Sequence, residues 1–174
     1  MLEIAVCDNE EIYTDIVESM LKKHSDQFEE PLNIHKFSDG RSLCDYMTTH
    51  NVDQLFLDVD MPEMNGIDVA EYIREELQNY IVTLFFITGT SGYERKLFEF
   101  QTFGFLEKPI DENKLVNSCY KAWVQESIEE IIREKKSCRA LATRGIFIGL
   151  SISKFYIFRR MVGKLLYITF RSME

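Results

Sequence analysis

Asp58 has the position of a phosphate-accepting nucleophile. It follows the apolar run 55–57, which reads as a buried strand. Polar groups follow three other apolar runs in the same way, namely the cluster Asp8-Asn9-Glu10, Thr88 and Lys108. In an open α/β sheet, the carboxyl ends of the strands form the edge where ligands bind. The sequence therefore predicts that these groups converge on Asp58.

These residue types suit phosphoryl transfer to a carboxylate. Both the carboxylate and the phosphoryl donor are anionic, so a hard cation such as Mg²⁺, which prefers oxygen ligands, would reduce their repulsion. Thr88 can donate its hydroxyl to one phosphoryl oxygen, and Lys108 can place its ammonium on another. Such catalysis consists of positioning and charge neutralisation, and its product is an aspartyl phosphate. The predicted magnesium ligands are the side chains of Asp8, Asn9 and Asp58 and the backbone carbonyl of Asp60.

Each of these residues has an ordinary interpretation when it is taken alone. An acidic residue at a strand end is usually just solvated, Thr88 could be a β-branched strand residue, and Lys108 could be a surface lysine. Their common order along the chain favours a site over these separate interpretations.

The elements that would carry these residues alternate along the chain. Strands are predicted at 4–7, 33–37, 55–57, 82–87 and 103–107, with helices between them, the last of these over 93–100. A long helix begins at Asp111, and Leu115, Cys119 and Trp123 form its apolar stripe. Strands that alternate with helices predict a parallel sheet with right-handed crossovers.

The charge of the 174-residue chain is divided between its two parts. Residues 133–174 contain ten Lys and Arg and two acidic residues, a net charge of +8, whereas the first 132 residues carry −17. This division favours an acidic regulatory domain joined to an anion-binding segment. The four cysteines form no metal-type spacing, and no basic, apolar leader opens the chain, so we expect free thiols and a cytoplasmic location.

Over about residues 2–125 the sequence resembles the receiver domain of bacterial two-component response regulators. The matching motifs are Cys7-Asp8-Asn9-Glu10, Leu57-Asp58-Val59-Asp60-Met61-Pro62, Asn65-Gly66, Ile87-Thr88-Gly89 and Lys108-Pro109-Ile110. The resemblance implies a flavodoxin-like, doubly wound sheet of five parallel strands in the order 2-1-3-4-5. It also implies a receiver domain at 1–125.

The resemblance assigns a role to each residue of the predicted site. Asp58 becomes the phospho-acceptor, Asp8 and Asn9 the metal-binding pair, Thr88 the switch hydroxyl and Lys108 the phosphate contact. A domain of this kind is not an enzyme towards an external substrate, because it catalyses only the gain and loss of its own phosphoryl group.

Further expectations come from the family alone. The Lys108–Pro109 peptide bond is expected to be cis, and Phe105 is expected to be the aromatic switch residue. The expected phosphoryl donor is a histidine kinase. The family also suggests a homodimer formed through the fourth helix, the fifth strand and the fifth helix.

One position departs from the family pattern. The acidic pair usually has two carboxylates, and here the second residue is Asn9. The loss of one negative charge predicts weaker Mg²⁺ binding, which Glu10 could offset through a water molecule. An interaction module of the same fold that works without phosphorylation therefore stays open.

A haloacid-dehalogenase-type phosphatase is the enzyme alternative. Its first two motifs resemble Asp58-Val59-Asp60 and Ile87-Thr88-Gly89, and Lys108 could pass for its third. Such a phosphatase also needs an acidic pair after the lysine, whereas the metal-type acidic residues of this chain precede the nucleophile.

The segment 139–174 resembles the start of a LytTR-type DNA-binding domain, after a helical linker at 126–138. Short strands are predicted at 145–150, 154–158 and 164–170. The segment is much shorter than a domain of about 100 residues, so we expect a truncated β-rich fragment, with specific DNA binding only if the domain were complete. The apolar stretch 146–158 is shorter than the about 20 residues of a membrane span, so we expect no membrane insertion.

Overall fold

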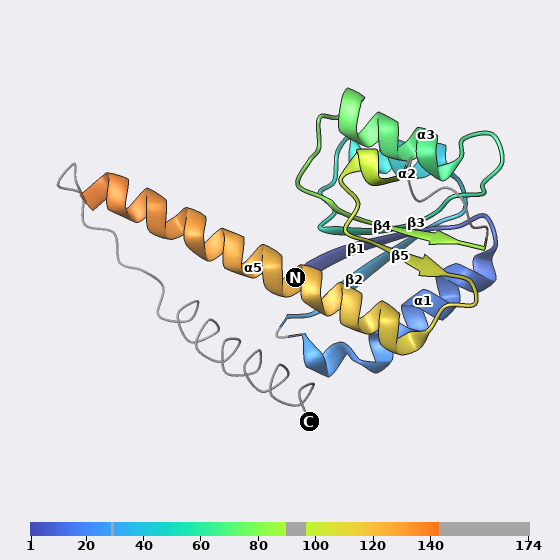
Figure 1. Ribbon diagram of the computed structural model, residues 1–174, viewed down its shortest axis with the longest axis horizontal. Coiled ribbons are helices and arrows are strands. Elements are labelled where there is room, and N and C mark those ends of the chain that lie inside the picture. Colours follow the sequence, from blue (N-terminus) through green and yellow to red (C-terminus); the bar gives the residue numbers. More distant parts are fainter. Residues whose placement is uncertain (29, 90–96, 143–174) are drawn as a thin grey trace. The chain divides into compact units, whose positions relative to one another are not determined.

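The computed structural model describes residues 1–28, 30–89 and 97–142. In these ranges a single five-stranded parallel sheet has the order β2-β1-β3-β4-β5 (Figure 1). This is the flavodoxin-like order that was predicted, and each predicted strand is present with bounds that shift by no more than about two residues. The strands are β1 (Leu2–Cys7), β2 (Leu32–Phe37), β3 (Gln54–Asp58), β4 (Thr83–Thr88) and β5 (Gly104–Glu107).

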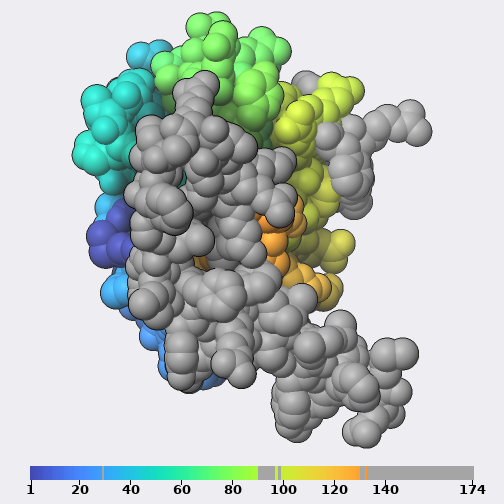
Figure 2. Space-filling view, turned by 90° about the vertical axis from the view of Figure 1, so that its left-hand side faces the viewer, coloured from blue at the N-terminus to red at the C-terminus, as the bar shows by residue number. Residues whose placement is uncertain are grey.

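Helices cover both faces of the sheet. On one face, α2 (Gly40–Met47) and α3 (Gly66–Glu71) pack side by side (Figures 1 and 2). On the other face lie α1 (Glu11–Lys23) and the first turns of α5 (Glu112–Ala142) (Figure 1). The central strands β3 and β4 are therefore buried on both faces, which explains their continuous apolar runs 55–57 and 84–87.

Side-chain caps fix where two loops turn into helices. The Asp39 carboxylate accepts a hydrogen bond from the backbone N–H of Ser42 at 2.8 Å and so opens α2. Asn65 accepts from the backbone N–H groups of Ile67 and Asp68 and opens α3, and the Asp68 carboxylate accepts in return from the Asn65 N–H. These caps satisfy backbone donors that the first turn of a helix leaves open.

A buried arginine holds the amino end of the sheet together. The helix α3 continues as a π-helical stretch, Tyr72–Glu76, and Arg74 in this stretch is buried. Its guanidinium donates hydrogen bonds to the carbonyl of Phe100 at 2.9 Å, of Asn79 at 2.5 Å and of Val82 at 3.2 and 3.3 Å. Burial lowers the pKa of Arg74, but an arginine side chain stays protonated in proteins. One side chain thus joins the end of α3 to the segments that lead into β4 and β5.

The described residues reach only part of the predicted C-terminal half. The compact unit Met1–Ala122 contains the sheet, and a second unit begins at Trp123. Because α5 is continuous from Glu112 to Ala142, the predicted linker at 126–138 is helical, and the helix continues past residue 138.

In the predicted helix over 93–100, residues 93–96 lie outside the described ranges, and Phe98–Phe100 form a 3₁₀ turn. The strands predicted beyond residue 145 also lie outside these ranges. None of the helices in the described part of the chain has the length and apolarity of a membrane crossing.

We predict that Arg74→Met lowers the free energy of unfolding by roughly 3 kcal/mol, because the buried Val82 carbonyl and the partly buried carbonyls of Asn79 and Phe100 lose their hydrogen-bond donor. The measurement is urea unfolding followed by circular dichroism. Arg41→Met is the matched control, since Arg41 is exposed on α2 and its loss should change stability by less than about 0.5 kcal/mol. Equal losses for the two variants would show that the hydrogen bonds of Arg74 do not stabilise the fold.

Candidate functional site

The carboxyl ends of three strands bring Asp8, Asp58 and Lys108 together. Asp8 follows β1, Asp58 is the last residue of β3, and Lys108 follows β5. The Lys108 Nζ atom lies 2.8 Å from Asp8 Oδ2 and 3.1 Å from Asp58 Oδ1. Asp8 is 0% and Asp58 2% exposed, and the lysine side chain is 11% exposed. Three of the predicted site residues thus form one buried ion-pair cluster.

Burial and charge act against each other in this cluster. Burial raises the pKa of Asp58, the Lys108 ammonium lowers it and the Asp8 and Asp60 carboxylates raise it again, so that the pKa ends above its ordinary value. Burial alone would lower the pKa of Lys108, but Asp8 and Asp58 outweigh burial and raise it. Lys108 is therefore charged at neutral pH. With one ammonium for two carboxylates, the cluster can accept further positive charge.

One oxygen of Asp8 is suited to a cation. Asp8 Oδ1 accepts a hydrogen bond from the backbone N–H of Glu10 at 2.9 Å. Asp8 Oδ2 forms the ion pair with Lys108, and among the described residues no second donor meets this buried oxygen. Such an acceptor beside a second carboxylate fits the oxygen preference of Mg²⁺. In the same ranges no three His, Cys, Asp or Glu side chains gather as metal ligands, so a cation here would also need amide or backbone oxygens.

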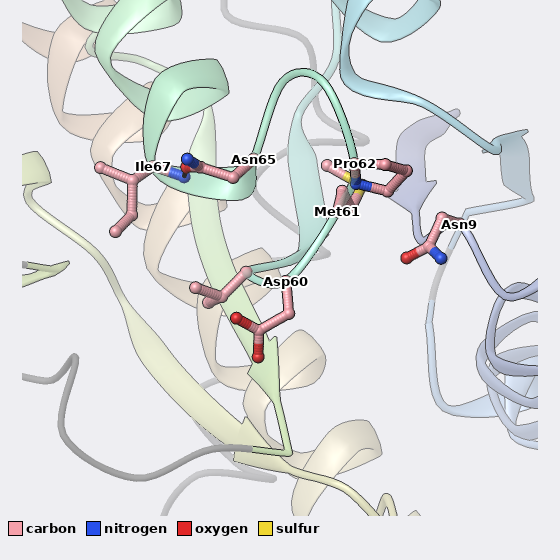
Figure 3. Close-up of a pocket in the computed structure, with 7 residues that line it drawn as sticks. Asn9, Asp60, Met61, Pro62, Asn65 and Ile67 are labelled. Atoms are coloured by element: carbon pink, nitrogen blue, oxygen red, sulfur yellow. Dashed lines mark hydrogen bonds between the residues drawn. The ribbon is translucent and has the colours of Figure 1, made fainter.

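Those further oxygens border a pocket of about 520 Å³ (Figure 3). Asn9 stands on one side of the pocket, across from the loop that follows β3 (Figure 3). Asn9 and Asp60 are both exposed, and each is close in sequence to one of the buried carboxylates. The pocket is lined by Asn9, Val59, Asp60, Met61, Pro62, Asn65 and Ile67.

Gly66 brings the loop after β3 back onto the backbone of Asp58. The Gly66 N–H donates to the Val59 carbonyl at 3.0 Å. A Cβ atom at position 66 would lie 2.1 Å from the Asp58 carbonyl oxygen, so no side chain fits there. In the sequence Asn65-Gly66 is only part of a motif, and the structure gives this glycine a specific role beside Asp58.

Thr88 and Phe105 lie on β4 and β5, the two strands at this side of the sheet, and Pro109 follows β5. Thr88 ends β4, and its carbonyl accepts a hydrogen bond from the Lys108 N–H at 2.9 Å. Phe105 is partly buried in β5, with its ring centroid 6.2 Å from that of Phe86 and the two rings nearly parallel. The Lys108–Pro109 peptide bond is cis.

Tyr13, for which the sequence predicted no role, contacts the cluster directly. The Lys108 Nζ atom lies 3.9 Å from the centroid of the Tyr13 ring. A cation this close to an aromatic face is attracted by the ring electrons. The sequence carries only a weak signal for this contact, because an aromatic residue a few positions after the acidic cluster could equally serve to pack a helix onto the sheet.

The chain matches the family model of the response regulator receiver domain over residues 4–120. It belongs to this family. With the family established, a haloacid-dehalogenase-type phosphatase is no longer a candidate.

Known proteins with similar sequence or structure agree with this assignment. The chain is 30% identical over 121 residues to the sensory transduction protein LytT of Bacillus subtilis (strain 168), which covers 70% of this chain and 48% of LytT. It is 24% identical over 128 residues to the transcriptional regulatory protein YpdB of Escherichia coli (strain K12), covering 72% of this chain and 50% of YpdB. The REC domain of AraT, a response regulator from Geobacillus stearothermophilus, is 25% identical with a TM-score of 0.62, covering 77% of this chain and 98% of that domain. The chain spans about half the length of the curated relatives LytT and YpdB.

We predict that Gly66→Ala lowers the free energy of unfolding by about 1–3 kcal/mol, because the new Cβ must push the loop away from Asp58. The measurement is urea unfolding, together with the amide chemical shifts of residues 58 and 59. Gly104→Ala in β5 is the control, since its Cβ would meet the Phe85 ring at an ordinary 3.7 Å. If both variants unfold alike and leave the two amide signals in place, the close approach at Gly66 does not shape the site.

Proposed function

We propose that this domain is the phosphorylation switch of a two-component response regulator and that Asp58 is its acceptor. The observation that supports this most strongly is the buried cluster of Asp8, Asp58 and Lys108 at the carboxyl edge of the sheet. Two carboxylates held around a single ammonium are a costly arrangement for a fold alone. They suit a site that receives a charged group.

The proposed reaction transfers a phosphoryl group from a phosphohistidine of a partner kinase. An Asp58 carboxylate oxygen forms a bond to phosphorus while the nitrogen–phosphorus bond breaks. The electron pair of that bond leaves with the imidazole nitrogen, and the product on Asp58 is an acyl phosphate. Lys108 Nζ, already 3.1 Å from Asp58 Oδ1, is close enough to turn to a phosphoryl oxygen. The Thr88 hydroxyl, at the end of the neighbouring strand, would donate to another phosphoryl oxygen.

We further propose that the site takes Mg²⁺. Asp8, Asn9 and Asp58 would hold the ion with their side chains and Asp60 with its backbone carbonyl. When bound, Mg²⁺ supplies the positive charge that offsets repulsion between the donor and the Asp58 carboxylate. The buried Asp8 carboxylate, held beside that of Asp58 with the Lys108 ammonium between them, supports this assignment.

The proposed output is a shift between two conformations. Thr88 would move towards the phosphoryl group and Phe105 would turn inward, which biases an equilibrium that already exists. The partly buried position of Phe105 beside Phe86 supports such a movement. For partners, we propose a homodimer through β5, α5 and the segment 93–100 that the sequence predicts as the fourth helix. We also propose that a complete C-terminal domain regulates transcription. YpdB is named as a transcriptional regulator, which supports the second.

The alternative is a receiver-like module that works without phosphorylation. Asn9 favours this alternative, because it leaves two carboxylate side chains, rather than three, as predicted ligands of the cation. Asp58 labelling and cation affinity separate the two functions.

We predict that incubation with Mg²⁺ and acetyl phosphate raises the intact mass by one phosphoryl group, and that Asp58→Asn abolishes the increase because the amide is not a nucleophile. Intact-mass spectrometry makes the measurement. Asp45→Asn is the control, because Asp45 is an exposed aspartate on α2 and should leave labelling unchanged. Equal labelling of wild type and Asp58→Asn would assign the phosphoryl group to another residue, and no labelling of wild type would favour the alternative module.

We predict that Asn9→Asp tightens Mg²⁺ binding roughly tenfold, because it adds one negative charge close to the cation. Isothermal titration calorimetry measures the affinity. Asn65→Asp is the matched control, because Asn65 lines the same pocket and aspartate preserves its role as helix cap. If the two variants tighten binding equally, the effect is a general one of charge, and Asn9 is not a ligand.

A further inference from the structure

We propose that Tyr13 is a positioning residue for Lys108, and that its ring holds the ammonium at Asp58 while the two carboxylates change partners. The inference rests on the proposed phosphoryl transfer but depends on a different residue. It concerns an uncharged side chain that lies outside the set of predicted ligands and phosphate contacts.

The Lys108 ammonium lies beside two carboxylates and one uncharged aromatic ring. Its Nζ atom lies 2.8 Å from Asp8 Oδ2, 3.1 Å from Asp58 Oδ1 and 3.9 Å from the centroid of the Tyr13 ring. The last distance is well inside the about 6 Å over which a cation is attracted to an aromatic face. Because the lysine side chain is only 11% exposed, water solvates little of it, and the ring occupies one side of the ammonium.

The start of α1 fixes the backbone of Tyr13 close to Asp8. Tyr13 lies in the first turn of α1 (Glu11–Lys23), and its N–H donates to the Glu10 carbonyl at 2.9 Å. The Glu10 N–H in turn donates to Asp8 Oδ1. The backbone at Tyr13 and the Asp8 carboxylate are thus joined by one short chain of hydrogen bonds. The loop that positions Asp8 therefore also fixes the backbone position from which the Tyr13 ring extends to Lys108.

Phosphoryl transfer changes both charged partners of Lys108. Asp58 becomes an acyl phosphate and loses its carboxylate charge, and Asp8 is expected to direct its oxygens to a cation. Each change weakens one ion pair of the ammonium. The Tyr13 ring is neutral, takes no part in the transfer and keeps its attraction for the cation throughout. It can therefore retain the ammonium within reach of the arriving phosphoryl oxygens.

A purely structural role for Tyr13 gives different expectations. A ring that only packs α1 onto the domain would affect stability, and its loss would slow labelling whether or not residue 108 carries a charge. A positioning role makes the effect of Tyr13 depend on the Lys108 ammonium. The experiment therefore combines a direct probe of the contact with a double-mutant cycle between the two residues.

The contact itself is tested in the unphosphorylated protein by NMR with ¹³Cε-labelled lysine, and Lys108→Met assigns the signal. Protons held over a ring face are shifted upfield. We expect the Lys108 ε-protons to lie upfield of those of the other lysines, to lose this shift in Tyr13→Leu and to keep it in Tyr13→Phe. A Lys108 signal among the other lysines in the wild type would overturn the proposal, and this result does not depend on whether Asp58 is phosphorylated.

The role in transfer is tested by the rate of labelling with saturating acetyl phosphate and Mg²⁺, followed by intact mass. We expect Tyr13→Leu to lower the rate constant roughly tenfold and Tyr13→Phe, which keeps the ring, to restore most of it. In a Lys108→Met background, Tyr13→Leu should have no further effect. Tyr80→Leu is the control, because it removes a ring that lies 5.8 Å from the Arg74 guanidinium, in a contact that involves none of the site residues.

These outcomes distinguish the positioning role of Tyr13 from the acceptor role of Asp58. An effect of Tyr13→Leu that persists in the Lys108→Met background, or an equal loss in Tyr13→Phe, contradicts the positioning role. An upfield Lys108 signal without any labelling of the wild type would contradict the acceptor role of Asp58 and, with it, a role of Tyr13 in transfer.

Discussion

A buried ammonium shared by two buried carboxylates is the interaction on which this site depends. Charges of this kind are tolerated in a protein interior only when they are paired and held in place. Asp8 and Asp58 come from adjacent strands, whereas Lys108 follows β5 and reaches across β4 to meet them. The order of the parallel strands thus brings the three charged residues together. Three further features lie beside the cluster, namely Gly66, the cis Lys108–Pro109 bond and the Tyr13 ring.

The sequence allowed the sheet and the principal charged groups to be predicted for a clear physical reason. β3 and β4 are buried on both faces, so their apolar runs are unmistakable, and a polar residue at the end of such a run must lie at the sheet edge. Asp58 and Thr88 were found in this way, and Lys108 was found at the end of the less regular run 103–107. The order of the strands came from the resemblance to the family, since the periodicity of a strand does not identify its neighbours.

The contacts that sequence patterns missed depend on distances between segments far apart in the chain. The ring of Tyr13 meets Lys108 only because α1 starts beside the end of β5. Arg74 looks like an ordinary helical arginine, yet it donates to carbonyls of Asn79, Val82 and Phe100. The closeness of Gly66 to Asp58 likewise follows from how the loop folds back. The sequence motif identifies the glycine but not its distance from Asp58.

The most direct test of the account is a crystal structure of the full chain with Mg²⁺ and beryllofluoride, which stands in for the phosphoryl group. We expect beryllofluoride on one Asp58 carboxylate oxygen and Lys108 Nζ turned from Asp8 Oδ2 to a fluorine atom. We expect the ion to be held by the side chains of Asp8, Asn9 and Asp58 and by the Asp60 carbonyl. A structure in which Asp58 carries no beryllofluoride under these conditions, or in which Lys108 still bridges the two carboxylates, would contradict it.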